Sequence, residues 1–329
     1  MKALICDRLG TPDLLTVADL PEPRPGPGEV AVAVAYVGLN FHDTLIVAGR
    51  HVVRPDPPFS PGSEYSGVVT AVGGGVASVA VGDRVAGNEE FGCARETIIV
   101  RADRVTRLPE DVPDRQAATV LVAYATAYHA LVQRAGLRAG ETLAVLGAAG
   151  GVGSAAVDVG RLLGARVIAC ASSDERAGAA RAQGAETTLS YGDGGIKERI
   201  KDATGGRGAD VVFDPVGGDV ALAAVRALAW EGRHLVVGFA AGTVPALPLN
   251  IPLVKGASVV GVFFGEFVRR EREAHERNLA QIFDWARRGE LRPRVHGVVP
   301  LDEGAAALTE LAAGRVRGKM LLRVSGRAE

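Results

Sequence analysis

The sequence predicts an α/β protein of two domains, one rich in antiparallel strands and one built on a doubly wound parallel sheet. Its 329 residues exceed what a single hydrophobic core usually serves. Up to about residue 115, short Val-rich runs alternate with Gly and Pro, which favours an antiparallel β domain. From about residue 116, strands and helices alternate, which is typical of a parallel sheet with right-handed crossovers.

In the first part, three Val-rich runs predict strands at residues 29–35, 66–72 and 96–100. The Pro- and Gly-rich residues 21–28 suit neither a helix nor a central strand, so we expect a surface connection there. The apolar stretch 117–132 predicts a buried helix, because it is too short and too polar to span a bilayer.

In the second part, short apolar runs that do not strictly alternate predict strands buried on both faces. These strands are expected at residues 142–146, 166–171, 186–189, 210–213 and 234–237, with a sixth at 259–264. Helices are expected at residues 154–163, 174–183, 195–203, 219–230 and 271–288. The elements after the last helix are expected to return to the first domain.

The composition of the chain excludes several classes of function. Lys and Arg total 37 against 38 Asp and Glu, so no strong basic field favours nucleic acid as the main partner. The three cysteines form no CxxC pair, which fits free thiols in a reducing cytoplasm better than disulfides or structural zinc. An acid at Asp7 comes too early for a signal peptide. We expect a soluble cytoplasmic protein that takes a small-molecule substrate and has no membrane partner.

A glycine loop between the first strand and first helix of the second part predicts a dinucleotide site. The loop reads Gly147-Ala148-Ala149-Gly150-Gly151-Val152-Gly153. Glycines there permit a tight turn, let the backbone approach a pyrophosphate and let the helix pack closely on the sheet. The N–H groups of the helix N-terminus then face the anion. A glycine turn without a ligand is the alternative.

The tip of the second strand favours NADPH over NADH. NAD-specific sites place an acid there, about 20 residues past the first glycine, whereas this strand ends at Ser172 and Ser173. With Arg176, these hydroxyls can bind a 2′-phosphate. Ser173 followed by acids is also what helix capping alone would produce, and Asp174 keeps NADH possible.

Several motifs together resemble the medium-chain dehydrogenase/reductase superfamily and, within it, the zinc-free NADPH-dependent quinone oxidoreductases, including ζ-crystallin-like members. They are found at residues 37–43 (VGLNFHD), 61–67 (PGSEYSG), 81–85 (VGDRV), 148–153 (AAGGVG), 214–218 (DPVGG) and 228–240 (LAWEGRHLVVGFA). The resemblance covers nearly the whole chain.

The resemblance implies a GroES-like β-rich catalytic domain, residues 1–120 plus 268–329, with an inserted Rossmann domain at 121–267 and NADPH in the cleft between them. Implied cofactor contacts are Asn40, Thr126, Ala149, Gly150, Gly151, Val152, Gly153, Ser172, Ser173, Arg176, Tyr191, Phe239, Phe263 and Lys319. A homodimer through the Rossmann edge strand at 259–264 is also implied.

Zinc is not expected. Where the zinc alcohol dehydrogenases of this superfamily carry a cysteine and a Gly-His-Glu motif, this chain has residues 40–43 (NFHD) and Gly62-Ser63-Glu64. We interpret Glu64 as a structural acid paired with a base such as Arg84 or Arg95.

Substrates that accept hydride without a metal then fit best. Candidate proton or hydrogen-bond donors are Asn40, His42 and His51, with Asn40 and His51 assigned as catalytic. His129 is more often a residue at the edge of a core than a cofactor contact.

The sequence therefore predicts an NADPH-dependent quinone oxidoreductase. Two alternatives stay open: a double-bond reductase of enals, enones or enoyl thioesters, and an NADPH-binding structural or interaction protein without turnover. Arginines at 269–270, 287–288, 292 and 294 would suit the phosphates of a thioester substrate, but solvated helix faces explain them equally well.

Overall fold

The computed structural model describes residues 1–324, which divide into two compact units. Of the described residues, unit 1 contains 1–122 and 295–324, and unit 2 contains 123–294. The first boundary lies two residues from the expected one. The second lies at 294/295 rather than 267/268, because helix α10 (Arg272–Arg287) packs against α3 (Ala123–Tyr128) of unit 2. The rings of Tyr128 and Trp285 meet there at 5.6 Å.

Unit 1 is built on a seven-stranded, mainly antiparallel sheet, as expected. Its order is β14 (Val295–Pro300), β15 (Lys319–Arg323), β3 (Glu29–Leu39), β4 (Glu64–Val72), β5 (Arg84–Asn88) and β7 (Val105–Arg107), with β6 (Thr97–Arg101) also paired to β3. A hairpin of β1 (Lys2–Ile5) and β2 (Thr16–Asp19) stands beside it. The C-terminal strand β15 pairs with β3, so the end of the chain does return to the first unit.

Helices α1 (Phe41–Val47), α2 (Asp114–Val120) and α11 (Gly304–Ala312) complete unit 1, together with single turns at Pro12–Leu14, Ala102–Arg104 and Leu301–Glu303. The core of this unit is aliphatic. It includes Val30, Val32, Val34 and Val37 of β3, which are fully buried. This burial follows the Val-rich pattern that predicted the strand.

Unit 2 is a six-stranded parallel sheet, which confirms the doubly wound α/β class. The strand order is β10 (Thr187–Ser190), β9 (Arg166–Ala171), β8 (Thr142–Val145), β11 (Ala209–Asp214), β12 (Leu228–Val236) and β13 (Ser258–Gly261). All five pairings are parallel. The strand order reverses between β8 and β11, where such folds bind ligands at the carboxyl ends of their strands.

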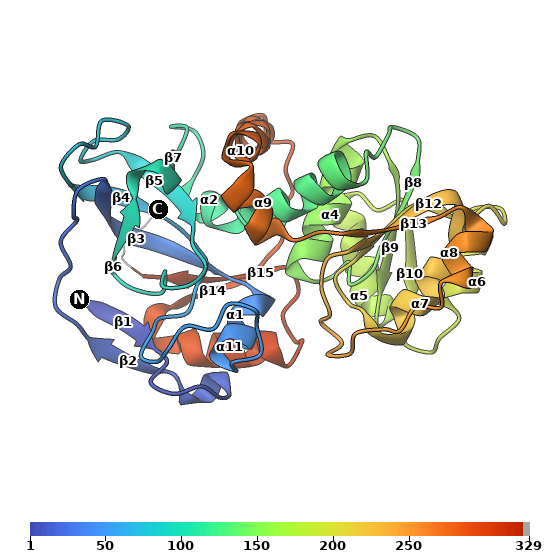
Figure 1. Cartoon of the computed structure of the whole chain (residues 1–329), viewed down its shortest axis with the longest axis horizontal. Helices are drawn as coiled ribbons and strands as arrows, with labels where there is room; N and C mark the ends of the chain where they lie inside the picture. Colours follow the sequence, from blue (N-terminus) through green and yellow to red (C-terminus); the bar gives the residue numbers. More distant parts are fainter. Residues whose placement is uncertain (325–329) are drawn as a thin grey trace. The chain divides into compact units, whose positions relative to one another are not determined.

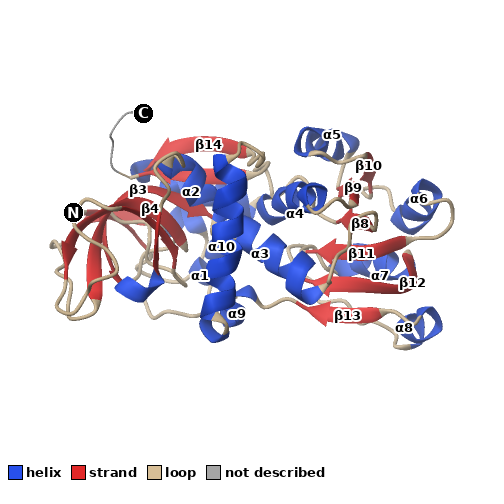
Figure 2. Ribbon diagram, turned by 90° about the horizontal axis from the view of Figure 1, so that it is seen from above, coloured by secondary structure: helices blue, strands red, loops and turns tan. Residues whose placement is uncertain are grey.

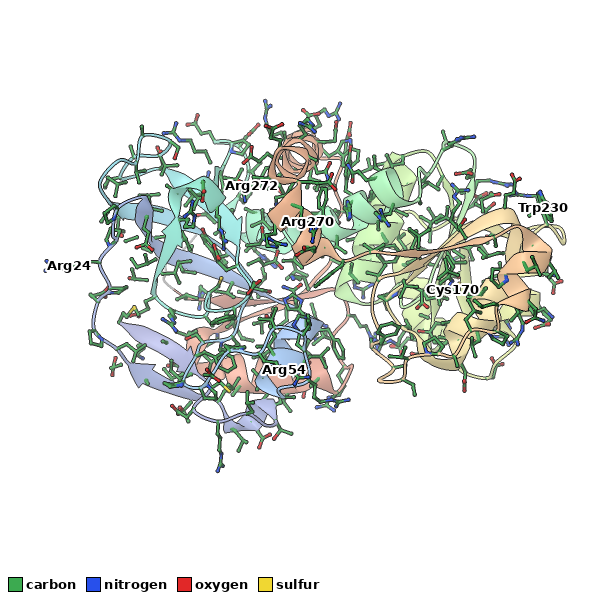
Figure 3. All side chains as sticks on the ribbon, in the orientation of Figure 1. Arg24, Arg54, Cys170, Trp230, Arg270 and Arg272 are labelled. Atoms are coloured by element: carbon green, nitrogen blue, oxygen red, sulfur yellow. The ribbon has the colours of Figure 1, made fainter. Side chains whose placement is uncertain are left out.

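Helices cover both faces of this sheet (Figures 1 and 2). In Figure 1, α4 (Gly151–Leu162) and α5 (Asp174–Gly178) lie on one face, and α6 (Ile196–Ala203), α7 (Gly218–Arg226) and α8 (Asn250–Lys255) on the other. Helix α9 (Phe264–Arg270) follows the last strand. Cys170 lies inside the sheet region in Figure 3, and all three cysteines, Cys6, Cys93 and Cys170, are buried and free.

Several predicted elements were wrong in their extent. The segment 117–132 is not one helix, because it divides into α2, α3 and a π-helical turn at His129–Arg134. At the break, the N–H of Val122 donates to the carboxylate of Glu64. Residues 228–230 belong to β12 rather than to the preceding helix, and β13 ends at Gly261, before the expected 264.

The segment 174–183 is also divided, into α5 and a 3-10 turn at Ala179–Gln183. Within residues 1–324, none of the helices has the length and apolar character that crossing a bilayer requires.

Candidate functional site

The glycine loop of unit 2 is a tight turn between β8 and α4. Gly147 has a φ of +60°, a conformation that glycine adopts without strain. At Gly153, an added Cβ would lie 2.1 Å from the carbonyl oxygen of Gly147, so no side chain fits there. Hydrogen bonds from Leu146 N–H to the oxygen of Phe213 and from Ala148 N–H to that of Cys170 tie the loop to both neighbouring strands.

The N-terminus of α4 has the form of an anion site. Gly150 caps this twelve-residue helix without a side chain, and the first helical bond runs from Ser154 N–H to the oxygen of Gly150 at 2.9 Å. The N–H groups of the first turn therefore have no acceptor within the helix. Together with the space kept by Gly153, these donors fit the pyrophosphate of a dinucleotide.

Tyr191, which follows β10, lies beside the tip of β9, because its backbone N–H donates to the oxygen of Ala171 at 2.9 Å. Burial raises the pKa of Tyr191 to about 12, while the charge of Arg176 and the backbone amide of Gly147 act in the opposite direction. Tyr191 is therefore close to both of these groups. Ser173 caps α5 by accepting the N–H of Arg176 at 3.3 Å, which confirms its capping role, and Ser172 is exposed.

A buried aspartate organises the turn after β11, a feature that the sequence analysis did not assign. The Oδ1 atom of Asp214 accepts the N–H groups of Val216 at 2.8 Å and Gly217 at 2.9 Å. Its Oδ2 lies 3.1 Å from Nε2 of the buried His234. A Cβ at Gly147 would touch Val216 at 3.0 Å, so this turn packs directly on the glycine loop.

The two predicted phenylalanine contacts are accessible. Phe239 is 40% exposed, and its ring lies 2.8 Å from where a Cβ at Gly217 would stand. Phe263 is 60% exposed and precedes α9. Thr126 is buried on α3. His129 stacks on Phe267 at 3.7 Å and bonds to Gln133, which confirms its interpretation as a core-edge residue.

In unit 1, Asn40, Glu64 and Lys319 form one buried polar cluster. The Lys319 ammonium forms an ion pair with Oε1 of Glu64 and lies 2.5 Å from Oδ1 of Asn40. The Asn40 amide nitrogen donates to Glu64 at 2.9 Å and lies 3.2 Å from both the Gly38 carbonyl and the Ser63 hydroxyl. Glu64 is fully buried and Lys319 is 4% exposed.

The expected partner of Glu64 was therefore wrong, because the base is Lys319. Arg84 binds Asp114 instead, and Arg95 binds the hydroxyl of Ser60. The reason is tertiary. Strand β15 pairs with β3 and so places its first residue, Lys319, next to Asn40, about 280 residues earlier in the chain.

Two histidines and an aspartate extend this cluster. Nε2 of His42 lies 3.6 Å from Oδ1 of the buried Asp43, and the rings of His42 and His51 are 5.7 Å apart. Nδ1 of His51 accepts the N–H of Val53 at 3.1 Å. Burial lowers the pKa of His51, and burial together with the Lys319 charge lowers that of His42 to about 4.

The residues at the expected zinc positions do not form a zinc donor set. The carboxylate of Glu64 is already bound by Lys319, Asn40 and Val122. Within residues 1–324, no group of three or more His, Cys, Asp or Glu side chains is arranged to hold a metal ion.

Most arginines of the predicted basic clusters are engaged with the protein's own groups. Arg269 and Arg270 both bind Glu266, and Arg288 binds Asp284. Arg292 and Arg294 donate to backbone carbonyls at Ala182 and Ala179. The helix-face interpretation therefore fits Arg269, Arg270 and Arg288, whereas Arg292 and Arg294 follow α10 and lie on no helix.

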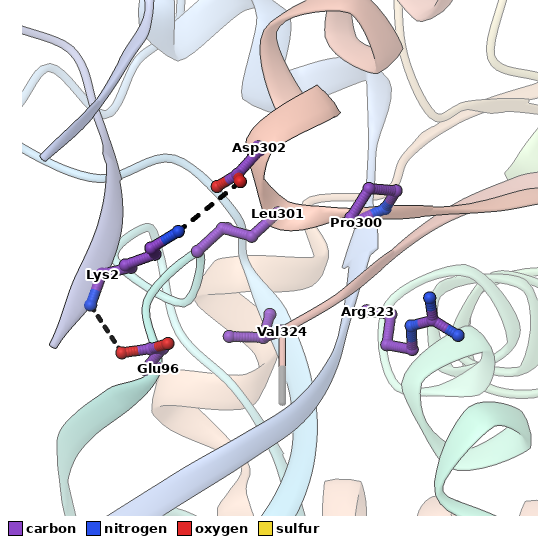
Figure 4. Close-up of a pocket in the computed structure, with 7 residues that line it drawn as sticks. All are labelled: Lys2, Glu96, Pro300, Leu301, Asp302, Arg323 and Val324. Carbon is purple, nitrogen blue, oxygen red and sulfur yellow. Dashed lines mark hydrogen bonds and ion pairs between the residues drawn. The ribbon is translucent and has the colours of Figure 1, made fainter. Parts of the chain in front are cut away.

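A shallow pocket of unit 1 contains none of the predicted site residues (Figure 4). It is lined by Lys2, Glu96, Pro300, Leu301, Asp302, Arg323 and Val324. Lys2 forms an ion pair with Asp302 at 3.6 Å, and its backbone N–H donates to Glu96.

Both units match models of known protein families. Residues 26–110 match the family model described as an alcohol dehydrogenase GroES-like domain, and residues 151–281 match that of a zinc-binding dehydrogenase. The chain is 37% identical over 322 residues to rat quinone oxidoreductase-like protein 2, covering 98% of this chain and 91% of that one.

A quinone oxidoreductase of Pseudomonas aeruginosa is 34% identical, covering 95% of this chain and 96% of that one. Among solved structures, Escherichia coli quinone oxidoreductase complexed with NADPH aligns with a TM-score of 0.91 at 27% identity, covering 98% of this chain and all of that one.

Proposed function

This chain belongs to the medium-chain dehydrogenase/reductase superfamily, within its quinone oxidoreductase-like family, and we propose that it transfers hydride from NADPH to a quinone. It is an oxidoreductase of this superfamily, and the similar Escherichia coli quinone oxidoreductase is complexed with NADPH. The observation that carries the proposal is the glycine loop, whose free helix N-terminus and missing side chain at Gly153 suit a pyrophosphate.

The cofactor, when bound, supplies the hydride. The N–H groups of Gly151, Val152 and Gly153 would hold its pyrophosphate, with Gly150 and Ala149 in the turn before them. Phe239, Phe263, Thr126, Asn40 and Lys319 remain proposed contacts. The turn organised by Asp214 contacts the glycine loop through Val216.

We propose NADPH rather than NADH because the β9 tip carries hydroxyls where an NAD site carries an acid. Ser172 is exposed, and Arg176 lies close enough to Tyr191 to affect its pKa. The test is Arg176→Ala, with Arg181→Ala, on the 3-10 turn that follows α5, as the control. Arg176→Ala is expected to weaken NADPH binding about tenfold or more and NADH binding little. Equal losses for both dinucleotides would refute the assignment.

A quinone is proposed as the acceptor because it takes hydride with hydrogen-bond donors alone. The side chains at the expected zinc positions are committed to one another, so positioned N–H donors must stabilise the developing oxyanion. His51 is the proposed catalytic donor. When its ring is neutral, Nδ1 accepts the Val53 N–H, so the hydrogen is carried on Nε2.

Asn40 is proposed to act differently from a free donor. Its amide hydrogens point at Glu64 and at the oxygens of Gly38 and Ser63, and its oxygen faces Lys319. We propose that Asn40 holds this part of the site in place, and that any cofactor contact it makes adds to these bonds.

The experiment is a substrate panel under NADPH. Oxidation of NADPH by 1,4-benzoquinone or 9,10-phenanthrenequinone, faster than by enones or enoyl thioesters, is the expected result. Preference for an enone or enoyl thioester would favour the double-bond reductase instead. Tight NADPH binding without turnover of any member would favour a binding protein.

A homodimer through β13 is also proposed. This edge strand exposes Val259 at 46%, and Trp230 on the neighbouring strand is 71% exposed (Figure 3). Light scattering should give twice the monomer mass of 34.0 kDa, and Val259→Lys should shift the protein toward monomer. A monomer in the unmodified protein would refute the proposal.

A further inference from the structure

The buried carboxyl group of Asp43 in unit 1 has one oxygen that takes no part in capping its helix. Asp43 is fully buried, and its Oδ2 accepts the Asn40 N–H at 2.7 Å, closing the capping box of α1. Its Oδ1 is enclosed without a hydrogen bond. The group that faces Oδ1 is Nε2 of His42 at 3.6 Å. Capping the helix needs only one carboxylate oxygen, so the second is available to His42.

His42 connects this buried group to the surface. Its side chain keeps 30% exposure, and its ring lies 5.7 Å from that of the half-buried His51. Imidazole can accept a proton at one ring nitrogen and release another from the second. Asp43, His42 and His51 therefore form a line of titratable groups that runs from the interior outward.

Burial inverts the usual order of acidity of Asp43 and His42. Burial raises the pKa of Asp43 to about 6, and burial with Lys319 lowers the pKa of His42 to about 4. Between these values the carboxyl group keeps its proton while the imidazole is neutral. Neighbouring groups also affect the pKa values of Asp43, His42 and His51: Lys319 of β15, Glu64 of β4, Ser63 just before it, and Glu90. Asp43 in turn raises the pKa of the Cys93 thiol.

We propose that Asp43 is the buried acid from which the reduction draws its proton, passed through His42 to the oxygen of the reduced substrate. Asp43 acts through another residue and is therefore a positioning residue. His51, with its fixed Nε2 hydrogen, holds the same oxygen by a hydrogen bond. This inference rests on the proposed function, because that reaction requires a proton.

The step balances. NADPH and a quinone give NADP⁺ and a hydroquinone when one hydride and one proton are added. As the ring nitrogen Nδ1 of His42 releases its proton to the product oxygen, Nε2 takes the proton of the Asp43 carboxyl group. His42 stays neutral, now with its hydrogen on Nε2. Between turnovers, water returns a proton to Nδ1 while the Nε2 hydrogen passes back to the buried Asp43 carboxylate, which restores both starting forms.

The test uses Asp43→Asn in the full-length protein. The Asn oxygen can still accept the Asn40 N–H, but the side chain cannot release a proton. In the unmodified protein, kcat with benzoquinone should fall as pH rises through about 6, because the protonated Asp43 carboxyl group is the active form. In Asp43→Asn, kcat should drop about 10²-fold and lose this inflection, with the Kd for NADPH unchanged.

Asp83→Asn is the matched control, because Asp83 also accepts a backbone N–H three residues back, from Ala80 at 2.8 Å. It should leave both kcat and the inflection unchanged. If Asp43→Asn does not fold, His42→Gln gives the same reading, since Gln can bond to Asp43 but cannot relay a proton. A variant of either relay residue that keeps the original pH profile would overturn the proposal.

A second readout separates this inference from the function it rests on. Followed by NMR, the ring C–H signals of His42 should shift near pH 6 as Asp43 ionises, and this shift should vanish in Asp43→Asn but persist in Asp83→Asn. If this NMR shift is present but no quinone is turned over, the quinone substrate is rejected while the Asp43–His42 link stands. Absence of the shift would reject that link even in an active enzyme.

Discussion

Replacing Lys319 by Met tests whether the buried polar cluster of unit 1 stabilises the fold as its geometry implies. The change removes the ammonium but keeps a side chain of similar length. Glu64, which is fully buried, then keeps only the N–H of Val122 and the amide of Asn40 as partners. Its charge is no longer compensated in a site closed to water.

Breaking a buried ion pair by removing one partner costs about 3–5 kcal/mol, because the other charge stays desolvated. Lys319 also donates to Asn40, so that oxygen loses a partner as well. We therefore expect a loss near the upper end of this range. Glu64→Gln in addition should recover part of it, because Gln removes the uncompensated charge while still accepting the Val122 N–H.

The assay is urea unfolding of the four proteins of this double-mutant cycle, followed by a probe in unit 1. The double variant is expected to be more stable than Lys319→Met alone. A loss below about 1 kcal/mol for Lys319→Met, or strictly additive losses in the cycle, would contradict a coupled buried pair.

Three further outcomes follow from single contacts. Gly153→Ala should abolish dinucleotide binding in calorimetric titration while Gly178→Ala, where a Cβ meets open space, does not, because only the former would press on the Gly147 carbonyl. His275→Phe should raise the free energy of unfolding by about 1 kcal/mol, because both ring nitrogens of His275 are buried without a partner beside two phenylalanines. The same variant should lose less stability in acid. Burial lowers the pKa of His275 to about 4, below the unfolded value of about 6.5, so the unfolded chain takes up the proton first. The stability linked to the neutral His275 ring is therefore full above about 6.5 and is lost as pH falls through 4. Unchanged acid unfolding curves would contradict this last expectation.

The sequence by itself determined the class of each unit and the position of the glycine turn between β8 and α4. The second unit was readable because parallel strands buried on both faces are continuous apolar runs, and because a pyrophosphate turn requires glycine at fixed spacing. The strand predicted at residues 166–171 agrees with β9 at both ends, and that at 142–146 agrees with β8 within one residue. These are local signals, carried by neighbouring residues.

Only the tertiary structure decided which side chains meet. Lys319 reaches Glu64 because β15 pairs with β3, and Asp214 meets His234 because β11 pairs with β12. The break in the helix at Val122 has the same origin, since its N–H goes to a carboxylate 58 residues earlier. Local pattern cannot encode such contacts, because each depends on burial that exists only after distant strands have paired.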